Sequence, residues 1–193
     1  MKLRSGVLIS ALGIALAALL ASDPVTVGAA SPGSVSSVPH PVWSEVKWPF
    51  LLDEWGIGRA FRCGSADCGT EVDLYLRAKV GFCNCATGVS DNADLDRVSD
   101  RELFSQDFVG LTDGRPVSVG RLQGRSRLYH VTIPYAAPRD MVAIGFNDQC
   151  DVAVATVLAD PGRLGEAEQL ALDFLSSDPV QRWAAAELGG NGI

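Results

Sequence analysis

The sequence predicts an α+β fold, in which an antiparallel sheet of about five or six strands carries packed helices and the domain is stapled by disulfides. A strict alternation of apolar and polar residues runs through residues 71–80, and two hairpin patterns fill residues 115–158. Two helical patterns follow in residues 163–188. Period two marks strands, and a spacing of three to four marks helices. Because most strands precede the helices instead of alternating with them, an α+β arrangement is favoured.

The N-terminal residues have the features of a secretory signal. Lys2 and Arg4 precede an apolar run at residues 7–21, and small residues close the segment near residue 30. This order is typical of a signal peptide, and the run is shorter than the roughly 20 residues that a membrane span needs. We expect residues 1–30 to be removed on export, which makes the protein periplasmic or secreted, with an uncleaved anchor as the alternative.

The composition after the signal limits the choice of partners. Residues 31–42 are rich in Ser, Pro and Gly, which is typical of a flexible leader. The single α+β domain is expected at residues 43–193. Without residues 1–30 the chain has 14 basic and 22 acidic residues, a net charge of −8. A chain this acidic is not expected to bind nucleic acid.

Two segments open the expected domain. Residues 43–55 hold three tryptophans, and we expect a short amphipathic helix or turn that caps the core, with an exposed partner or membrane-interface segment as the alternative. Strands are expected at residues 59–63 and 72–80. In the second strand, the aliphatic side chains point inward, while polar ones such as Arg77 and Lys79 point to solvent.

Residues 91–108 are acidic, with a helical pattern that breaks once. Ser99 to Glu102 fits a capping box that starts the second helical piece. Three oxygen donors have the spacing that opens a calcium loop: Asn92, Asp94 and Asp96. Arg97 stands where such a loop requires glycine, which argues against calcium.

The remaining elements are two hairpins and two helices. We expect the hairpin turns at Gln123-Gly124 and Asn147-Asp148. The second hairpin is apolar on both faces, which favours a place in the middle of a covered sheet. A helix is expected at residues 163–176, and another begins at Asp178-Pro179 and stops at Gly189-Gly190.

The cysteines are expected to form disulfides, because exported proteins live where disulfides persist. Four of the five lie in one window of 23 residues: Cys63, Cys68, Cys83 and Cys85. We expect two bridges within this cluster, each joining one cysteine of the first pair to one of the second. A bridge between neighbours two apart on a strand lies near the upper limit of disulfide geometry. Cys150 is expected to be free and buried on a strand.

Two other interpretations of the four-cysteine cluster stay open. A CxC pair on the wet face of a strand suits thiol exchange, although the sequence has no CxxC motif and few groups that lower a thiol pKa. Four thiolates also suit zinc or copper(I), although their spacing departs from that of structural zinc sites. His130 is the only histidine in the expected domain. The leading interpretation involves no metal and no cofactor.

Residues 115–139 contain five arginines and no acidic residue. The five are Arg115, Arg121, Arg125, Arg127 and Arg139. One interpretation is that they neutralise the acidic residues 91–107. The other is a docking patch for an acidic partner protein, an anionic ligand or anionic headgroups, in which Arg121, Arg125 and Arg127 bind the partner. Charge reversal at Arg125 and Arg127 is then expected to abolish capture without changing stability.

The sequence shows no catalytic motif: it lacks GxSxG, HExxH and a glycine-rich phosphate loop. His130 alternates with apolar residues in a hairpin strand and is expected to be structural, which leaves a Cys150 and His130 pair as the one nucleophilic arrangement to consider. We therefore expect a non-enzymatic binding or accessory module in the cell envelope. A thiol-redox or metal-handling protein is the alternative.

Overall fold

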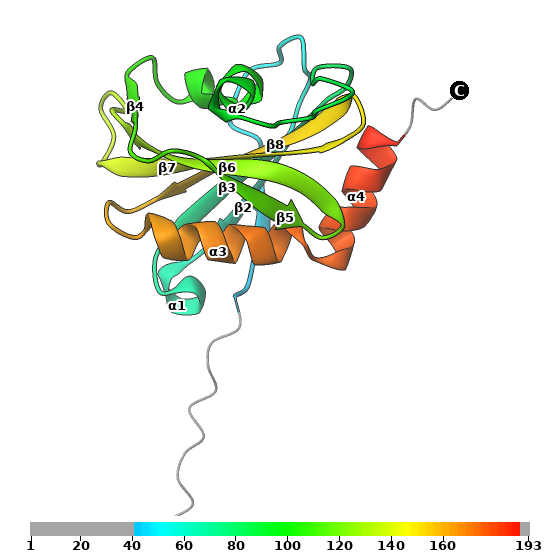
Figure 1. Ribbon diagram of the computed structural model, residues 1–193. Coiled ribbons are helices and arrows are strands. Elements are labelled where there is room, and N and C mark those ends of the chain that lie inside the picture. Colours follow the sequence, from blue (N-terminus) through cyan, green and yellow to red (C-terminus); the bar gives the residue numbers. More distant parts are fainter. Residues whose placement is uncertain (1–40, 190–193) are drawn as a thin grey trace, which may run out of the picture. The chain divides into compact units, whose positions relative to one another are not determined.

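The described part of the chain forms one antiparallel sheet with helices on both faces (Figure 1). The structure is a computed structural model that describes residues 41–189. The α+β class is confirmed, but the sheet has eight strands instead of five or six. The predicted signal peptide and all but the last two residues of the predicted leader lie outside the described residues.

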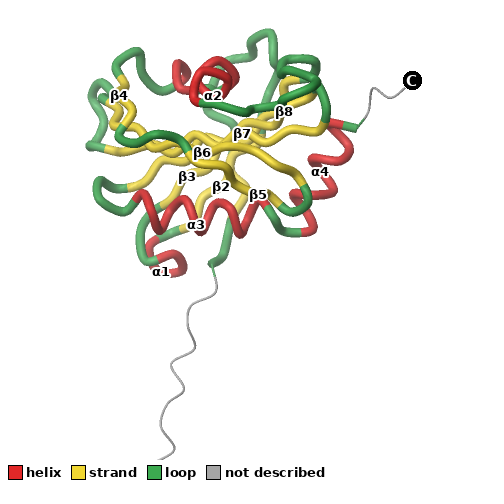
Figure 2. The backbone as a smooth tube through the Cα atoms, in the orientation of Figure 1, coloured by secondary structure: helices red, strands yellow, loops and turns green. Residues whose placement is uncertain are grey.

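The strand order is β1-β2-β3-β8-β7-β6-β4, and β5 also pairs with β6. Figure 2 shows the strands in yellow as one layer between helices drawn in red. The strands are β1 (Ser44–Val46), β2 (Arg59–Cys63), β3 (Val72–Lys79), β4 (Phe108–Gly110), β5 (Arg115–Val119), β6 (Leu122–Val131), β7 (Arg139–Asp148) and β8 (Asp151–Ala159). The helices are α1 (Ser65–Cys68), α2 (Asn92–Val98), the 3-10 turn η1 (Arg101–Leu103), α3 (Leu164–Leu175) and α4 (Asp178–Leu188). None of these helices is both long and apolar enough to cross a membrane.

Two hydrophobic layers hold the sheet. On one face, α3 and α4 pack their small and aliphatic side chains, such as Ala167 and Ala184, against Leu74 and Ile144. On the other face, α2 packs Leu95 among Tyr129 and other residues of the sheet. Both faces of the central strands β7 and β8 are covered, and the middle of each strand is apolar on both faces, as the sequence predicts.

The polar face of β3 is buried, which corrects the prediction that it faces solvent. Arg77 and Lys79 are only 3% and 4% exposed. The segment before β2 lies over this face, where Trp48 and Phe50 contact the Tyr75 ring edge to face. The tryptophan-rich segment therefore forms the short strand β1 and an extended cover, and not a helix.

Neither hairpin turn falls on the expected pair of residues: the first lies before its expected pair, and the second lies after it. The first turn is Gly120-Arg121, and the second is Gln149-Cys150, with Gln149 at a φ of 52°. Gly124 lies within β6, where a Cβ atom would come 2.1 Å from the carbonyl oxygen of Gly145 on the adjacent strand. The absence of a side chain at Gly124 therefore allows two backbones to approach closely, and this glycine does not form a turn.

The acidic segment, residues 91–108, contains fewer helical residues than predicted. It forms α2, then η1, and then the edge strand β4. The residue that precedes η1 is Asp100 and not Ser99, and its side chain makes no capping hydrogen bond. The two C-terminal helices are confirmed, with α4 starting at Asp178 and capped by Gly189.

Candidate functional site

The structure corrects the predicted pairing of the cysteines. Cys63 is bonded to Cys68, and Cys85 is bonded to Cys150. Cys83 is a free, buried cysteine. Cys150 lies in the turn between β7 and β8 and not on a strand, so it faces the loop that follows β3. The sequence signal at Asn147-Asp148 placed this turn two residues too early and thus put Cys150 in the strand.

The predicted four-cysteine cluster does not form, because β3 separates its two halves. Cys63 and Cys68 lie before the start of β3, while Cys83 and Cys85 follow its end. An eight-residue strand spans roughly 23 Å between its ends. In residues 41–189, no three His, Cys, Asp or Glu side chains gather in a way that could hold a metal ion.

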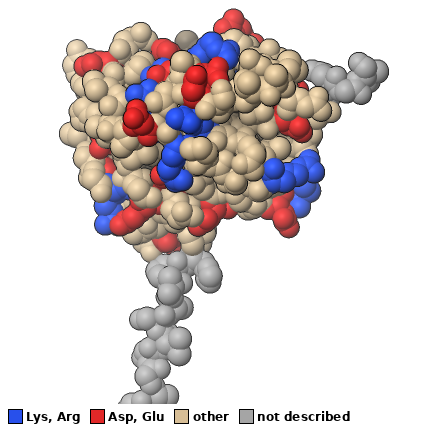
Figure 3. All heavy atoms as spheres, viewed as in Figure 1, with Lys and Arg blue, Asp and Glu red and all other residues tan. Residues whose placement is uncertain are grey.

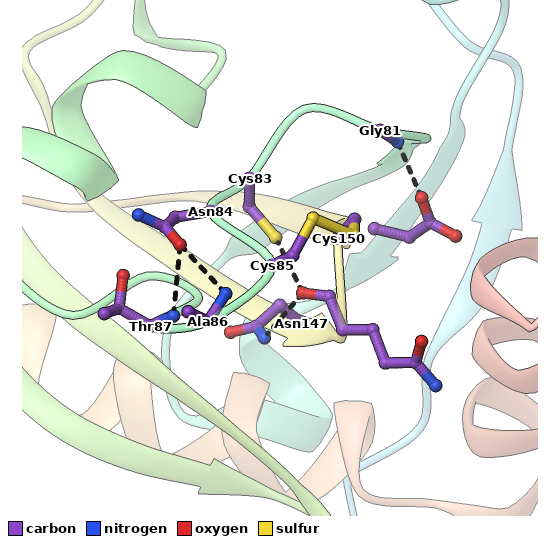
Figure 4. Close-up of a disulfide and its surroundings, with 10 residues drawn as sticks. Gly81, Cys83, Asn84, Cys85, Ala86, Thr87, Asn147 and Cys150 are labelled. Atoms are coloured by element: carbon purple, nitrogen blue, oxygen red, sulfur yellow. Dashed lines mark hydrogen bonds between the residues drawn. A yellow bond between two sulfur atoms is a disulfide. The ribbon is translucent and has the colours of Figure 1, made fainter.

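Three cysteines instead meet at the turn between β7 and β8, and we call Cys83, Cys85 and Cys150 the three-cysteine site. The backbone N–H of Cys83 donates to the carbonyl oxygen of Cys150 at 3.0 Å, and the Cys83 thiol donates to the carbonyl oxygen of Gln149 at 3.2 Å. Figure 4 shows the Cys83 side chain pointing toward the disulfide. A free thiol therefore lies beside a disulfide.

The exposure of the three sulfur-bearing residues differs. Cys83 is buried at 8% exposure, whereas Cys85 is exposed and Cys150 is half-buried. Cys85 projects from a tight turn in which the side-chain oxygen of Asn84 accepts hydrogen bonds from the N–H groups of Ala86 and Thr87. Cys150 lines a hollow of about 330 Å³ that Gly81 and Leu188 also border. The disulfide thus faces solvent, while the thiol faces the disulfide.

The charges around Cys83 act against its ionisation. Burial raises the pKa of the Cys83 thiol, and the carboxylates of Asp151 and Asp94 raise it further. The guanidinium of Arg97 lowers the same pKa but does not reverse the shift. At neutral pH Cys83 is therefore a protonated thiol, and its thiolate forms only under alkaline conditions.

Two of the three predicted partner-binding arginines, Arg125 and Arg127, make contacts with other residues of the same chain. Arg125 donates to the side-chain oxygen of Asn92 at 2.9 Å and to the carbonyl oxygen of Gly114 at 2.6 Å. Arg127 forms an ion pair with Asp96 at 2.8 Å and stacks on the Tyr129 ring. The ion pair of Arg127 favours the interpretation in which the arginines neutralise the acidic segment, whereas Arg125 is bonded to uncharged oxygens.

Arg121, the third of them, has a different environment. It is exposed in the turn between β5 and β6, beside Arg182 of α4. The two border a shallow hollow of about 390 Å³ with Gly120, Asp178, Gln181 and Ala185, which we call the turn–α4 surface. Among the arginines of residues 41–189, only Arg121, Arg125 and Arg182 have no carboxylate within ion-pair distance.

The surface as a whole has mixed charge. Figure 3 shows a largely uncharged face on which groups of Lys and Arg spheres lie next to Asp and Glu spheres, with a basic group at the right where α4 meets the β5–β6 turn. The other hairpin arginines fit this pattern, since Arg115 pairs with Glu168 and Arg139 with Glu71 and Asp73. The large positive patch suggested by the sequence is therefore mostly neutralised.

A buried charge network lies on β3. Both guanidinium edges of Arg77 are occupied, one by Asp100 and the other by Asp53. Lys79 reaches Asp100 at 2.8 Å and the carbonyl oxygen of Val98 at 2.8 Å. Burial alone would lower the pKa of Arg77, but the hydrogen bonds to Asp100 and Asp53 outweigh it and raise that pKa. The network satisfies its own charges and has the character of a structural element.

The remaining sequence candidates also have internal partners. His130 contacts Asp140 through Nδ1 at 2.7 Å, at the opposite end of β7 from the Cys150 turn, so the two do not form a catalytic pair. The three calcium-loop donors diverge. Asn92 accepts from Arg125, Asp94 accepts from Ser90, and Asp96 accepts from Tyr129. No calcium loop is formed.

Sequence reasoning missed two features that matter here. The bond between Cys85 and Cys150 spans a separation of 65 residues, and no local pattern signals such a pairing. Arg182 joins Arg121 only because α4 folds back beside the β5–β6 turn. The one available signal was the position of Arg182 two residues after Val180, on the face of α4 opposite the apolar stripe.

No protein family profile matches the chain, and no curated protein matches it. The solution structure of cyanobacterial PsbP (CyanoP) from Synechocystis sp. PCC 6803 is similar over 69% of this chain and 78% of that one, with 11% identity and a TM-score of 0.41. The crystal structure of CalU16 from Micromonospora echinospora is similar over 78% and 94%, with 12% identity and a TM-score of 0.25.

Proposed function

We propose that the protein is an exported, disulfide-stabilised accessory module that binds an acidic partner protein through the turn–α4 surface. The observation that carries this proposal is that Arg121 and Arg182 are exposed side by side without a carboxylate partner in the described part of the chain. Exposed guanidinium groups without an internal partner are free to form ion pairs with carboxylates of another molecule.

Two features support the exported location. The bonds Cys63–Cys68 and Cys85–Cys150 suit an oxidising compartment, where disulfides persist. The pattern of residues 1–30 is that of a secretory signal, and in this proposal residues 31–42 are a leader ahead of the module at 43–193. Both lines of support are independent of the binding surface.

The shape and charge of the turn–α4 surface suggest what it binds. The hollow is shallow, and Asp178 offsets part of the positive charge of the two arginines. A surface with a small net positive charge suits one or two carboxylates of an acidic protein segment better than a densely charged polymer. The binding is then salt-dependent, because the participating charges are exposed.

The test is a titration with a glutamate-rich peptide, followed by fluorescence anisotropy at two salt concentrations. We expect the double variant Arg121→Glu with Arg182→Glu to lose about tenfold or more in affinity, since each exposed ion pair contributes up to about 1 kcal/mol and the reversed charges repel the peptide. Its melting temperature should stay at the wild-type value, because neither side chain has an ion-pair partner in the described residues.

A matched control separates this surface from overall charge. Lys47→Glu with Arg163→Glu changes the net charge by the same amount at exposed positions away from the turn–α4 surface. It should leave the affinity for the peptide within about twofold, which is less than 0.5 kcal/mol. Equal losses in the two double variants would show a nonspecific charge effect and overturn the proposed surface.

A further inference from the structure

We propose that the bridge between Cys85 and Cys150 is exchangeable, with Cys83 as its internal exchange partner, so that the protein converts a buried thiol into an exposed one. The proposal rests on the three-cysteine site and is independent of the turn–α4 surface. In the observed form the free thiol is Cys83, which is buried. In the exchanged form the bridge joins Cys83 to Cys150, and Cys85 presents the free thiol.

The placement of Cys83 supplies the first argument. Its backbone is hydrogen-bonded to Cys150 at 3.0 Å, and its thiol donates to the neighbouring carbonyl oxygen of Gln149 at 3.2 Å. Two backbones in hydrogen-bond contact have a separation that a disulfide can bridge, about 4.4–6.8 Å between Cα atoms. The Cys83 side chain also points toward the existing bridge (Figure 4).

The difference in exposure supplies the second argument. A buried thiol is shielded from reagents in solution, yet the disulfide beside it has one exposed end at Cys85 and lines an open hollow at Cys150. The nearest electrophile for a Cys83 thiolate is therefore the bridge itself. When exchange occurs, the sulfur that is released belongs to the exposed residue, which a partner thiol or disulfide can reach.

The exchange is a balanced thiol–disulfide substitution. Cys83 loses its proton to solvent, and its thiolate forms a bond to the Sγ of Cys150 as the bond between Cys85 and Cys150 breaks. Cys85 leaves as a thiolate and takes up a proton. One disulfide and one thiol are present before and after, so the step needs neither an oxidant nor a reductant. Attack on Cys85 is disfavoured, because a bridge from Cys83 to Cys85 would join residues only two apart.

The charged groups at the site set the conditions for exchange. Burial, Asp151 and Asp94 raise the pKa of the Cys83 thiol, while Arg97 opposes them. The thiolate is the attacking species, so the exchange rate rises with pH through the alkaline range. At neutral pH the exchange is slow, and the bridge between Cys85 and Cys150 persists.

The first experiment traps the released thiol. Folded protein is held at about pH 9, above the ordinary thiol pKa of about 8.5, then quenched in acid, labelled with N-ethylmaleimide after unfolding, and mapped by peptide mass spectrometry. We expect label at Cys85 together with a peptide in which Cys83 is bonded to Cys150. The variant Cys83→Ser, whose hydroxyl can still donate to Gln149, should show no label at Cys85.

Internal and variant controls decide the outcome. Label at Cys63 or Cys68 as well would indicate scrambling in unfolded protein, and label at Cys85 in the Cys83→Ser variant would show that the bridge opens without Cys83. Either result overturns the proposal, as does a wild-type protein that carries label only at Cys83. The wild-type outcomes are read from one digest, and the Cys83→Ser outcome is read from a parallel digest of that variant.

A second variant tests whether Cys83 can reach Cys150, and this test does not depend on the rate of exchange. When Cys85→Ser is exported to the periplasm, we expect Cys83 to bond to Cys150, which leaves no free thiol and a melting temperature close to that of the wild type. Two free thiols at Cys83 and Cys150 in this variant would show that Cys83 does not reach Cys150, and the proposal would be wrong.

Discussion

Asp100 is the residue at which two buried cations of β3 meet. Its carboxylate accepts from Arg77 at 2.5 Å and 3.0 Å and pairs with Lys79 at 2.8 Å, and its own side chain is 6% exposed. Buried cations are costly unless they are paired, because burial removes their hydration. The prediction that the polar face of β3 is exposed to solvent was wrong here. It was based on the polarity of the side chains alone, whereas the carboxylate of Asp100, from another segment, allows the two cations to be buried.

We expect Asp100→Asn to lower the free energy of unfolding by about 3 kcal/mol, because the substitution leaves Lys79 and one edge of Arg77 buried without a carboxylate. Urea unfolding at neutral pH measures this change. Asp113→Asn, at an exposed position, is the matched control and should stay within about 0.5 kcal/mol of the wild type. If both variants unfold at the same urea concentration, the network contributes no stability.

At the scale of elements, the short helix α2 is attached to the sheet by its buried apolar side chain Leu95 and by the polar contacts of Asp96. This carboxylate accepts from Tyr129, pairs with Arg127 at 2.8 Å, and lies 3.5 Å from Arg101. Burial and the hydrogen bond to Asp96 raise the pKa of Tyr129, so its hydroxyl stays protonated and remains a donor. A helix of seven residues is too short to be stable alone, so these contacts hold it in place.

We therefore expect Arg127→Glu to lower the free energy of unfolding by about 2 kcal/mol, because it removes the ion pair, places a second carboxylate beside Asp96 and uncovers the Tyr129 ring. Amide hydrogen exchange should speed up first in α2. Arg121→Glu on the same hairpin, which lacks an ion-pair partner in residues 41–189, should leave both quantities unchanged. Unaltered exchange in α2 of Arg127→Glu would contradict this account.

Elements with a strong period were predicted well, and their connections were not. The strand at 72–80 and the helices α3 and α4 follow from periodicity, and the strand at 59–63 follows from its short apolar run. The turn predictions were wrong because residues that are typical of turns make other contacts in the structure. Asn147, for example, accepts from the N–H of Val89 and donates to Gln149. A shift of the turn by two residues moved Cys150 out of the strand, and the candidate site changed with it.

At the scale of the whole molecule, the two disulfides constrain the chain unequally. Cys63 and Cys68 are only 5 residues apart, so their bridge closes a small loop around α1. The bridge from Cys85 to Cys150 spans 65 residues and links the loop after β3 to the hairpin of β7 and β8. Closing a longer loop removes more conformational freedom from the unfolded chain, which stabilises the folded state more.

We expect the double variant Cys85→Ala with Cys150→Ala to lose about 4 kcal/mol of unfolding free energy, and Cys63→Ala with Cys68→Ala to lose about 2 kcal/mol, from loop closure alone. Urea unfolding without reductant measures both, with Cys83→Ser as a control that keeps both bridges. Cys63 is fully buried, so its replacement also removes packing contacts. This additional loss reduces the difference in unfolding free energy between the two double variants. If the Cys63 and Cys68 variant is the less stable of the two, local packing at the start of β3, and not the long-range bridge, dominates the stability of the molecule.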